Sequence, residues 1–170
     1  MTFKHFNEMQ LEFMQACGQP TFTLRSTLES FARGYPNNPL LMSQVSLWKE
    51  LIHEEVNREL FTNLQYLLHY KLNSASKIED VVSDIADDIG DSVYVLCGLA
   101  NSLGIPLHTV YETIHEANMA KAVRQADGSF RVLRRHDGKI LKPEGWKPPN
   151  IKALLAMHIA ETEPYNDTET

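Results

Sequence analysis

The sequence predicts an all-α fold, a helical bundle of about four main helices that ends in a small β-hairpin-like arm. Three observations favour this class. Residues 40–72 contain neither proline nor glycine, apolar side chains recur at helical spacing from residue 3 onward, and Asp-Gly turn signals occur only after residue 124. A chain of 170 residues with 43% hydrophobic residues is long enough for one domain with a real core.

The first helix is expected over residues 3–17, where apolar residues follow helical spacing until a Gly-Gln-Pro sequence at residues 18–20 ends the segment. A polar stretch is expected from there to Pro39. The second helix should run from about Leu40 to about Leu72, because nothing within that segment breaks a helix.

The third helix is expected to begin near Ser76 and to close at Gly104. Pro106 suits the first turn of a fourth helix, which should end near residue 123. Together with the segments that follow, these helices are predicted to form a single domain over residues 1–160.

The character of the chain changes after residue 124. Asp127-Gly128 and Asp137-Gly138 are turn signals on either side of FRVLRR, which predicts a small hairpin. The segment KPEGWKPP must be extended, because proline lacks a donor and disfavours helix in the residue before it. Residues 124–150 are therefore predicted to form an arm, followed by a short helix over residues 151–160 and a flexible tail over residues 161–170.

Charge and composition exclude several classes of protein. A net charge of −6 leaves no broad basic face, so we expect no nucleic-acid partner. The N-terminal MTFKHFNEMQ lacks an apolar signal core, and no apolar run approaches membrane-spanning length, so we expect no membrane partner. Cys17 and Cys97 fall in apolar stretches and are expected to be buried thiols, which favours a cytoplasmic location.

Six acidic side chains lie on two of the expected helices: Glu54, Glu55 and Glu59 on the second, and Asp84, Asp88 and Asp91 on the third. Glu55 and Glu59 are one turn apart and border the apolar side of their helix, whereas Glu54 lies nearer the opposite side. The three aspartates form an i, i+4, i+7 stripe that continues into the apolar Val95 and Leu99.

Carboxylates at this density repel one another unless a cation lies between them. No Lys or Arg relieves the aspartate stripe, although Arg58 could pair with Glu54 or Glu55. Either these residues are solvated helix faces, or they hold a divalent, oxygen-preferring ion such as Mg²⁺. The second interpretation predicts a metal-dependent enzyme that acts on phosphates.

The fourth helix adds an amide and a cation. Its inward arc contains Leu107, Val110 and Ile114, and Asn118 and Lys121 lie on the same arc. Lys121 could simply snorkel from the helix C-terminus, where its charge suits the helix dipole. Alternatively, Lys121 neutralises a substrate phosphate while Asn118 hydrogen-bonds ribose or phosphate oxygens.

Three segments together resemble the motifs of the all-alpha NTP pyrophosphatase superfamily, the MazG-like and dimeric dUTPase-like helical enzymes. These segments are Glu54-Glu55-Val-Asn-Arg-Glu59, Asp88-Ile-Gly-Asp91 with Tyr94 after it, and Asn118-Met-Ala-Lys121. They stand in the order of the family's EExxE, ExxD and NmxK patterns. The last glutamate of the first motif falls one position late here. Either Glu55 and Glu59 act together, or Glu54 and Glu55 do.

The resemblance implies a Mg²⁺-dependent hydrolase, with Mn²⁺ as an alternative metal, that converts an NTP or dNTP into a nucleoside monophosphate and pyrophosphate. It also implies a homodimer or homotetramer. The metal ligands that it implies are four carboxylates, Glu55, Glu59, Asp88 and Asp91. The substrate-binding groups that it implies are Asn118, Lys121, Lys139 and Lys142. Catalytic roles fall to Glu54, as a general base, and to Lys121, at the leaving pyrophosphate.

Two other classes remain open. Glu50 with His53, and Glu112 with His115, form two ExxH pairs on alternate helices, which is the spacing of a ferritin-like di-iron carboxylate protein. Glu50 and Glu112 both point away from the apolar arcs of their helices, which speaks against that class. The third possibility is a non-catalytic helical module that oligomerises or caps a partner.

Overall fold

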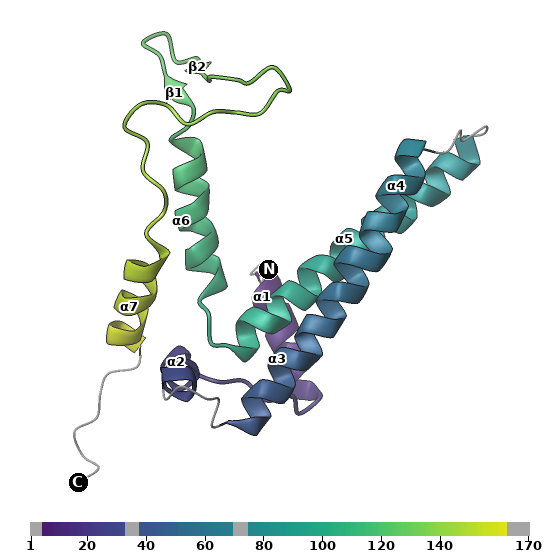
Figure 1. Cartoon of the computed structure of the whole chain (residues 1–170), viewed down its shortest axis with the longest axis vertical. Helices are drawn as coiled ribbons and strands as arrows, with labels where there is room; N and C mark the ends of the chain where they lie inside the picture. Colours follow the sequence, from purple (N-terminus) through teal and green to yellow (C-terminus); the bar gives the residue numbers. More distant parts are fainter. Residues whose placement is uncertain (1–4, 33–37, 70–74, 163–170) are drawn as a thin grey trace, which may run out of the picture. The chain divides into compact units, whose positions relative to one another are not determined.

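The computed structural model describes residues 5–32, 38–69 and 75–162. The chain forms two compact units, Met1–Ile105 and Pro106–Thr170, and Figure 1 shows the elements of both. Unit 1 holds α1 (Phe6–Ala16), α2 (Leu24–Ala32), α3 (Pro39–Ile52), the π-helix η1 (His53–Leu60), α4 (Phe61–His69) and α5 (Ala75–Ser102). Unit 2 holds α6 (Leu107–Met119), β1 (Val123–Arg124), β2 (Phe130–Arg131) and α7 (Ile151–Thr162). The predicted all-α fold class is confirmed, and the single-domain boundaries stay a prediction.

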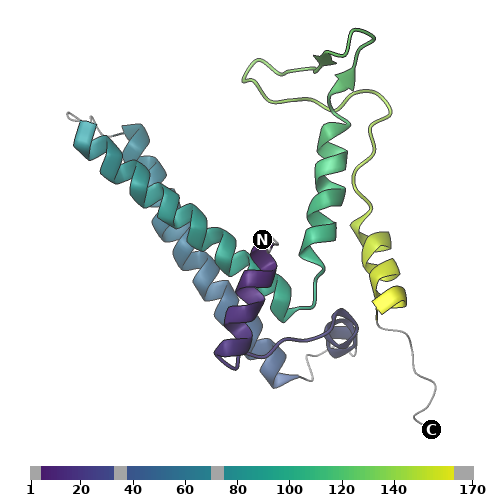
Figure 2. The ribbon, with the colours of Figure 1, turned by 180° about the vertical axis from the view of Figure 1, so that it is seen from behind.

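Unit 1 is built on two long helical rods that lie side by side. The first rod is continuous through α3, η1 and α4, and each of its three parts packs against α5, which runs antiparallel to it (Figure 1). Asn38 caps the start of this rod, because its side chain accepts a hydrogen bond from the Leu41 amide. Helix α1 packs on the C-terminal part of α5, at the end of the rods where α3 lies, as Figure 2 shows from behind.

The core of unit 1 is formed where α1, α3 and α5 meet. Met14, Trp48 and Val95 form its buried cluster. The Trp48 ring lies directly over Gly98, where any Cβ would collide with it, so a glycine is required there. The Trp48 indole N–H donates to the Ser102 hydroxyl at 2.6 Å, which satisfies the one polar group that this side chain buries.

The segment that the sequence predicts to be a polar stretch contains the helix α2, which was not predicted. Thr23 caps this helix, since its hydroxyl accepts from the Ser26 amide at 3.1 Å. Leu24 and Thr27 are its buried side chains. Gly104, with φ of 68°, lies against the backbone just before α2, where no Cβ would fit. The predicted end of the third helix at this glycine is confirmed.

Unit 2 contains the predicted arm. The strands β1 and β2 pair antiparallel around the Asp127-Gly128 turn, and an isolated bridge joins Arg134 to Ile140 around the second predicted turn. The predicted short helix is present as α7, which packs against α6.

Two details of the remaining predictions differ or fall outside the described residues. Cys97 is buried as expected, but Cys17 is exposed because it lies at the C-terminal end of α1, and both are free thiols. The predicted helix over residues 40–72 is present as far as His69, and residues 70–72 lie outside the described residues. No single helix among the described residues is long and apolar enough to cross a membrane; α5 and α6 pass that test only as a pair.

Candidate active site

The two acidic segments predicted from the sequence face each other across η1 and α5, which pack together. Burial raises the pKa of Glu55, and the negative charges of Glu59, Asp91, Glu54 and Asp88 raise it further, in that order of size. The carboxylate of Glu55 on η1 is therefore close enough to Asp88 and Asp91 of α5 for their charges to raise its pKa. The structure brings the predicted ligands of both helices to one acidic face.

Asp88 is the buried member of this face, with 7% of its surface exposed, whereas Asp84, Asp91 and Glu59 are exposed. The side-chain amide of Asn63, on α4, donates a hydrogen bond to Oδ2 of Asp88 at 2.9 Å. This bond fixes the orientation of the carboxylate and leaves its other oxygen free of that contact. Asp88 is thus held in place by a neutral donor.

Ser92 lies one helical turn after Asp88 on the same face of α5 and is also buried. Its hydroxyl oxygen has no hydrogen-bond partner among the described residues. A buried hydroxyl without a partner is costly in a folded protein unless water or an ion completes its contacts. The polar face around Asp88 therefore has unused hydrogen-bonding capacity.

The donor set of this face fits a hard divalent cation. All of the predicted ligands are carboxylates, which suit Mg²⁺ and Mn²⁺, and the orphaned Ser92 hydroxyl lies beside them. Among the described residues, no three carboxylate, His or Cys side chains converge closely enough to form a ready-made metal site. Binding a metal here would therefore draw the carboxylates inward from both helices.

Glu54 differs from the other glutamates of η1. It forms an ion pair with Arg58, one turn further on, at 3.8 Å, and both side chains are substantially exposed. Such an exposed pair contributes little to stability. As whole residues, Glu54 and Glu55 are both half-buried, but only Glu54 forms this ion pair with Arg58.

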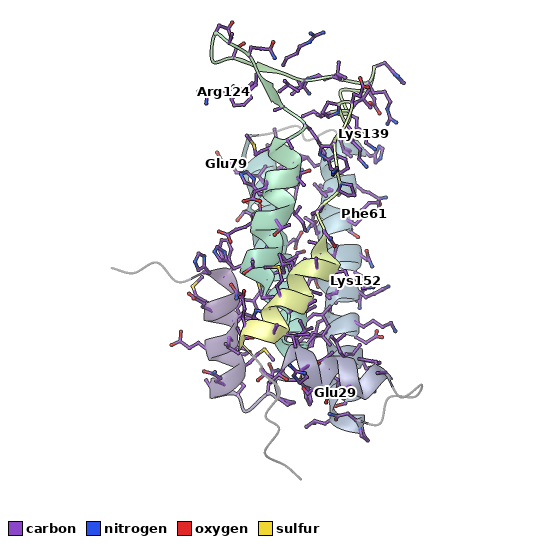
Figure 3. The ribbon with its side chains drawn as sticks, turned by 90° about the vertical axis from the view of Figure 1, so that its left-hand side faces the viewer. Glu29, Phe61, Glu79, Arg124, Lys139 and Lys152 are labelled. Atoms are coloured by element: carbon purple, nitrogen blue, oxygen red, sulfur yellow. The ribbon has the colours of Figure 1, made fainter. Side chains whose placement is uncertain are left out.

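In unit 2, three of the four predicted substrate-binding residues gather around Trp146. The Lys121 ammonium donates to Oδ1 of Asn118 at 2.6 Å and lies 5.5 Å from the centre of the Trp146 ring. The Lys142 ammonium lies 4.3 Å from that same ring. Lys139 lies in the Asp137-Gly138 turn, where its backbone amide donates to Asp137, and Figure 3 labels it in the arm.

The ExxH pairs do not form a metal site in this structure. Glu50 is exposed and pairs with its neighbour Lys49 at 2.9 Å. Glu112 is exposed and lies 3.3 Å from His108, one turn before it. Glu50 and Glu112 therefore face solvent and partners on their own helices, as the sequence pattern predicts.

The comparison with protein families agrees with this geometry. The family model of phosphoribosyl-ATP pyrophosphohydrolase matches residues 23–118, which is more than half of the chain. The chain belongs to this family. Phosphoribosyl-ATP pyrophosphohydrolases are part of the all-alpha NTP pyrophosphatase, MazG-like superfamily, so the predicted resemblance is confirmed. Comparison with curated proteins gives no match.

Membership of the phosphoribosyl-ATP pyrophosphohydrolase family makes the chain a pyrophosphohydrolase that acts on nucleotide substrates. The matched residues contain both acidic segments and reach Asn118. Lys121, Lys139 and Lys142 lie beyond the matched residues, so the family match gives no support for a role of these lysines.

The sequence did not single out the two polar side chains beside Asp88, nor the contacts of Trp146 with the lysines of the arm. Asn63 and Ser92 flank Asp88, and Trp146 organises the lysines of the arm. Ser92 could have been found, because it follows Asp88 at i+4 on a stripe that turns apolar. Asn63 could not, because its orientation depends on the π-helical segment before it.

Proposed function

We propose that this protein is a Mg²⁺-dependent nucleoside triphosphate pyrophosphohydrolase that converts an NTP or dNTP and water into a nucleoside monophosphate and pyrophosphate. The observation that carries this proposal is the acidic face, in which Glu55 is half-buried among the carboxylates of two helices. Such a concentration of negative charge suits divalent cations and, through them, a polyphosphate.

In this proposal, Glu55 and Glu59 from η1 and Asp88 and Asp91 from α5 hold the metal. When bound there, Mg²⁺ supplies charge neutralisation for the phosphates and a water of lowered pKa. In the proposed reaction, the oxygen of a water molecule bonds to the α-phosphorus, the bond from that phosphorus to the α–β bridging oxygen breaks, and pyrophosphate leaves. Glu54 lies at the edge of the face, within reach of solvent, and accepts the proton of the water.

The residues that we propose to bind phosphate all belong to unit 2. Lys121 and Lys142 bring two ammonium groups to the same indole ring, and a phosphate between them would relieve their mutual repulsion. Asn118, which already contacts Lys121, offers an amide to the same anion. Lys139 lies in the neighbouring turn of the arm and adds to the local positive charge.

A second candidate substrate is phosphoribosyl-ATP, which the name of the matching family specifies. Purified protein should be incubated with Mg²⁺ and with each NTP, each dNTP or phosphoribosyl-ATP, and both pyrophosphate and orthophosphate should be measured. Release of pyrophosphate from NTPs or dNTPs supports the proposal. Release from phosphoribosyl-ATP alone would assign the second substrate. Orthophosphate as the first product, or no product from any of these compounds, would contradict the proposed reaction.

We also propose that the protein is a homodimer or homotetramer that assembles through α5. The exposed apolar side chains of this helix, Ile78, Val82, Ile89, Val93 and Leu96, are 37–51% exposed. Their spacing puts them within roughly 60° of one another around the helix, in one stripe. A stripe of this kind on a soluble domain suits a second copy of the same helix.

Light scattering after size exclusion tests this assembly. The wild type should be an oligomer, and the double variant Val82→Glu with Ile89→Glu should be a monomer. A monomeric wild type would contradict this assembly.

A further inference from the structure

The π-helix η1 occupies eight residues of an otherwise α-helical rod, His53–Leu60. The amide of Phe61 donates to the carbonyl of Val56, five residues earlier, which is the hydrogen bond that defines this helix type. Helices of this type are rare and occur mostly as single turns, often at functional sites. The local sequence HEEVNREL contains no Gly or Pro that would force the irregularity. Its cause must lie in the contacts made before and after it.

The effect of η1 is to change the phase between α3 and α4. In an uninterrupted α-helix, residue i+8 is rotated roughly 80° from residue i. A π-helical turn contains about one extra residue, so residue i+8 takes the position that residue i+7 has in an α-helix. That position is about 20° from residue i, in the opposite rotational direction. Asn63 is the i+8 residue of Glu55. The π-helix therefore returns Asn63 to the side of the rod that carries Glu55 and faces α5.

The contacts of Asn63 agree with this phase. Asn63 is half-buried, and its amide reaches the Asp88 carboxylate of α5 at 2.9 Å. Asp88 is itself buried. Without the extra residue, the Asn63 side chain would rotate away, and a buried carboxylate would lose its donor.

We propose that Asn63 is a positioning residue for the metal ligand Asp88. We also propose that η1 acts as a register device, which means that its one extra residue rotates α4 so that Asn63 reaches Asp88. This inference rests on the proposed metal site. Groups that orient a metal ligand by hydrogen bonding act on metal affinity as well as on rate. Asn63 donates a hydrogen bond to one oxygen of Asp88 and so restricts the side chain to one rotamer. The other oxygen is then already oriented to bind the cation.

The first test measures Mn²⁺ binding by calorimetry, without substrate, in Asn63→Leu, Asn63→Gln and Asp88→Asn. Asn63→Leu keeps a branched side chain but removes the donor, and should weaken binding about 10- to 100-fold. Asn63→Gln keeps a donor and should recover part of that loss. Asn57→Leu is the matched control, because Asn57 is an exposed amide of the same rod. Its affinity should match the wild type.

The outcomes separate this inference from the proposed function. If Asn63→Leu binds Mn²⁺ like the wild type while Asp88→Asn does not, the role of Asn63 is wrong and the metal site stands. If both variants bind normally, the metal site itself is wrong, and this inference falls with it.

The second test addresses the register and uses one deletion and one insertion at the same place. Deleting Asn57 removes the extra residue, so the segment can become α-helical while α3 and α4 keep their phase. This variant should keep its melting temperature and bind Mn²⁺ within a few-fold of the wild type. Inserting one alanine after Asn57 should lower both the melting temperature and the affinity for Mn²⁺, because a second extra residue would rotate α4 away from its contacts with α5. A deletion variant that loses metal binding would overturn the register device, whatever the insertion does.

Discussion

Trp146 donates its indole N–H to the backbone carbonyl of Ala117 at 2.7 Å. Ala117 lies in the last turn of α6, where carbonyl groups have no partner within the helix. The arm thus returns to the end of α6 and caps it with an aromatic side chain. The same ring then carries the ammonium groups of Lys121 and Lys142, so one contact orders the cationic groups of unit 2.

Trp146→Ala should raise KM for the triphosphate by about three- to tenfold with little change in kcat. The reason is that the hydrogen bond and the two cation–π contacts contribute about 1 kcal/mol each, and their loss frees the lysines. Trp146→Phe keeps an aromatic face and should show a smaller effect. Steady-state kinetics at saturating Mg²⁺ measures both. A lowered melting temperature with unchanged KM would show that Trp146 is structural only.

Asp88→Asn and Asp91→Asn should each lose activity by about 100-fold or more, because the charge that holds the metal is removed. Both variants should fold, and the metal-free proteins should melt no lower than the wild type, since repulsion on the acidic face is relieved. Asp87→Asn is the control, because Asp87 is exposed on the same helix. If both Asp88→Asn and Asp91→Asn turn over substrate at close to the wild-type rate, these two residues do not belong to the active site.

The glutamates of η1 should separate into two groups. Glu55→Gln and Glu59→Gln should resemble the aspartate variants, because Glu55 lies among the carboxylates of α5 and Glu59 is its strongest charged neighbour. Glu54→Gln should bind metal normally and lower only kcat, since Glu54 pairs with Arg58 at the edge of the face. Measuring Mn²⁺ affinity and kcat for all three decides the assignment. Loss of metal binding in Glu54→Gln with normal binding in Glu59→Gln would reverse it.

The aspartates of α5 could be predicted to share a face, because this helix is α-helical throughout and its spacing alone determines which side chains share a face. The aspartate stripe follows directly from i, i+4, i+7 spacing. Helix α2 was missed because polar residues such as Arg25, Ser26 and Glu29 outnumber its few apolar ones. Its formation depends on burying Leu24 within unit 1, which is a tertiary effect.

The π-helix could not be predicted, because HEEVNREL is an ordinary helical sequence. Its geometry follows from matching two packed surfaces, one before the segment and one after it. A helical wheel drawn with a constant 100° per residue therefore misplaces every side chain after Val56, including Asn63. The hydrogen bond from the Trp146 indole to Ala117 could not be predicted for a similar reason, since it forms only when the chain folds back on itself.

The raised pKa of Glu55 leads to a prediction about pH. Because its neighbours and its burial raise this pKa, the folded state binds the proton more tightly than the unfolded chain does. Proton binding by Glu55 therefore stabilises the metal-free folded state. This contribution is full below the ordinary Glu pKa of 4.5 and is lost as pH rises through the raised pKa of Glu55. Mg²⁺ competes with this proton, so the gain in Tm on adding Mg²⁺ should be larger at pH 7 than at pH 5.

Calorimetry at both pH values, with and without Mg²⁺, checks this expectation. Glu55→Gln removes the titrating group, and the difference between the wild type and this variant isolates the contribution of Glu55 from that of the seven histidines. A Mg²⁺ gain in the wild type that is equal at both pH values, or larger at pH 5, would contradict the linkage.

Lys121→Ala should raise KM for the triphosphate about tenfold or more and lower kcat less. Lys121 gives a charge-assisted hydrogen bond to Asn118 and lies over Trp146, so its ammonium is already oriented when an anion arrives. Losing a point charge that meets a polyphosphate mainly weakens binding, with a further loss of rate if the leaving pyrophosphate is stabilised too. Lys152→Ala is the matched control, because Lys152 is exposed on α7 (Figure 3). If Lys121→Ala melts much lower and keeps its KM, its ammonium serves the structure of unit 2, and phosphate binding passes to Lys142 and Lys139.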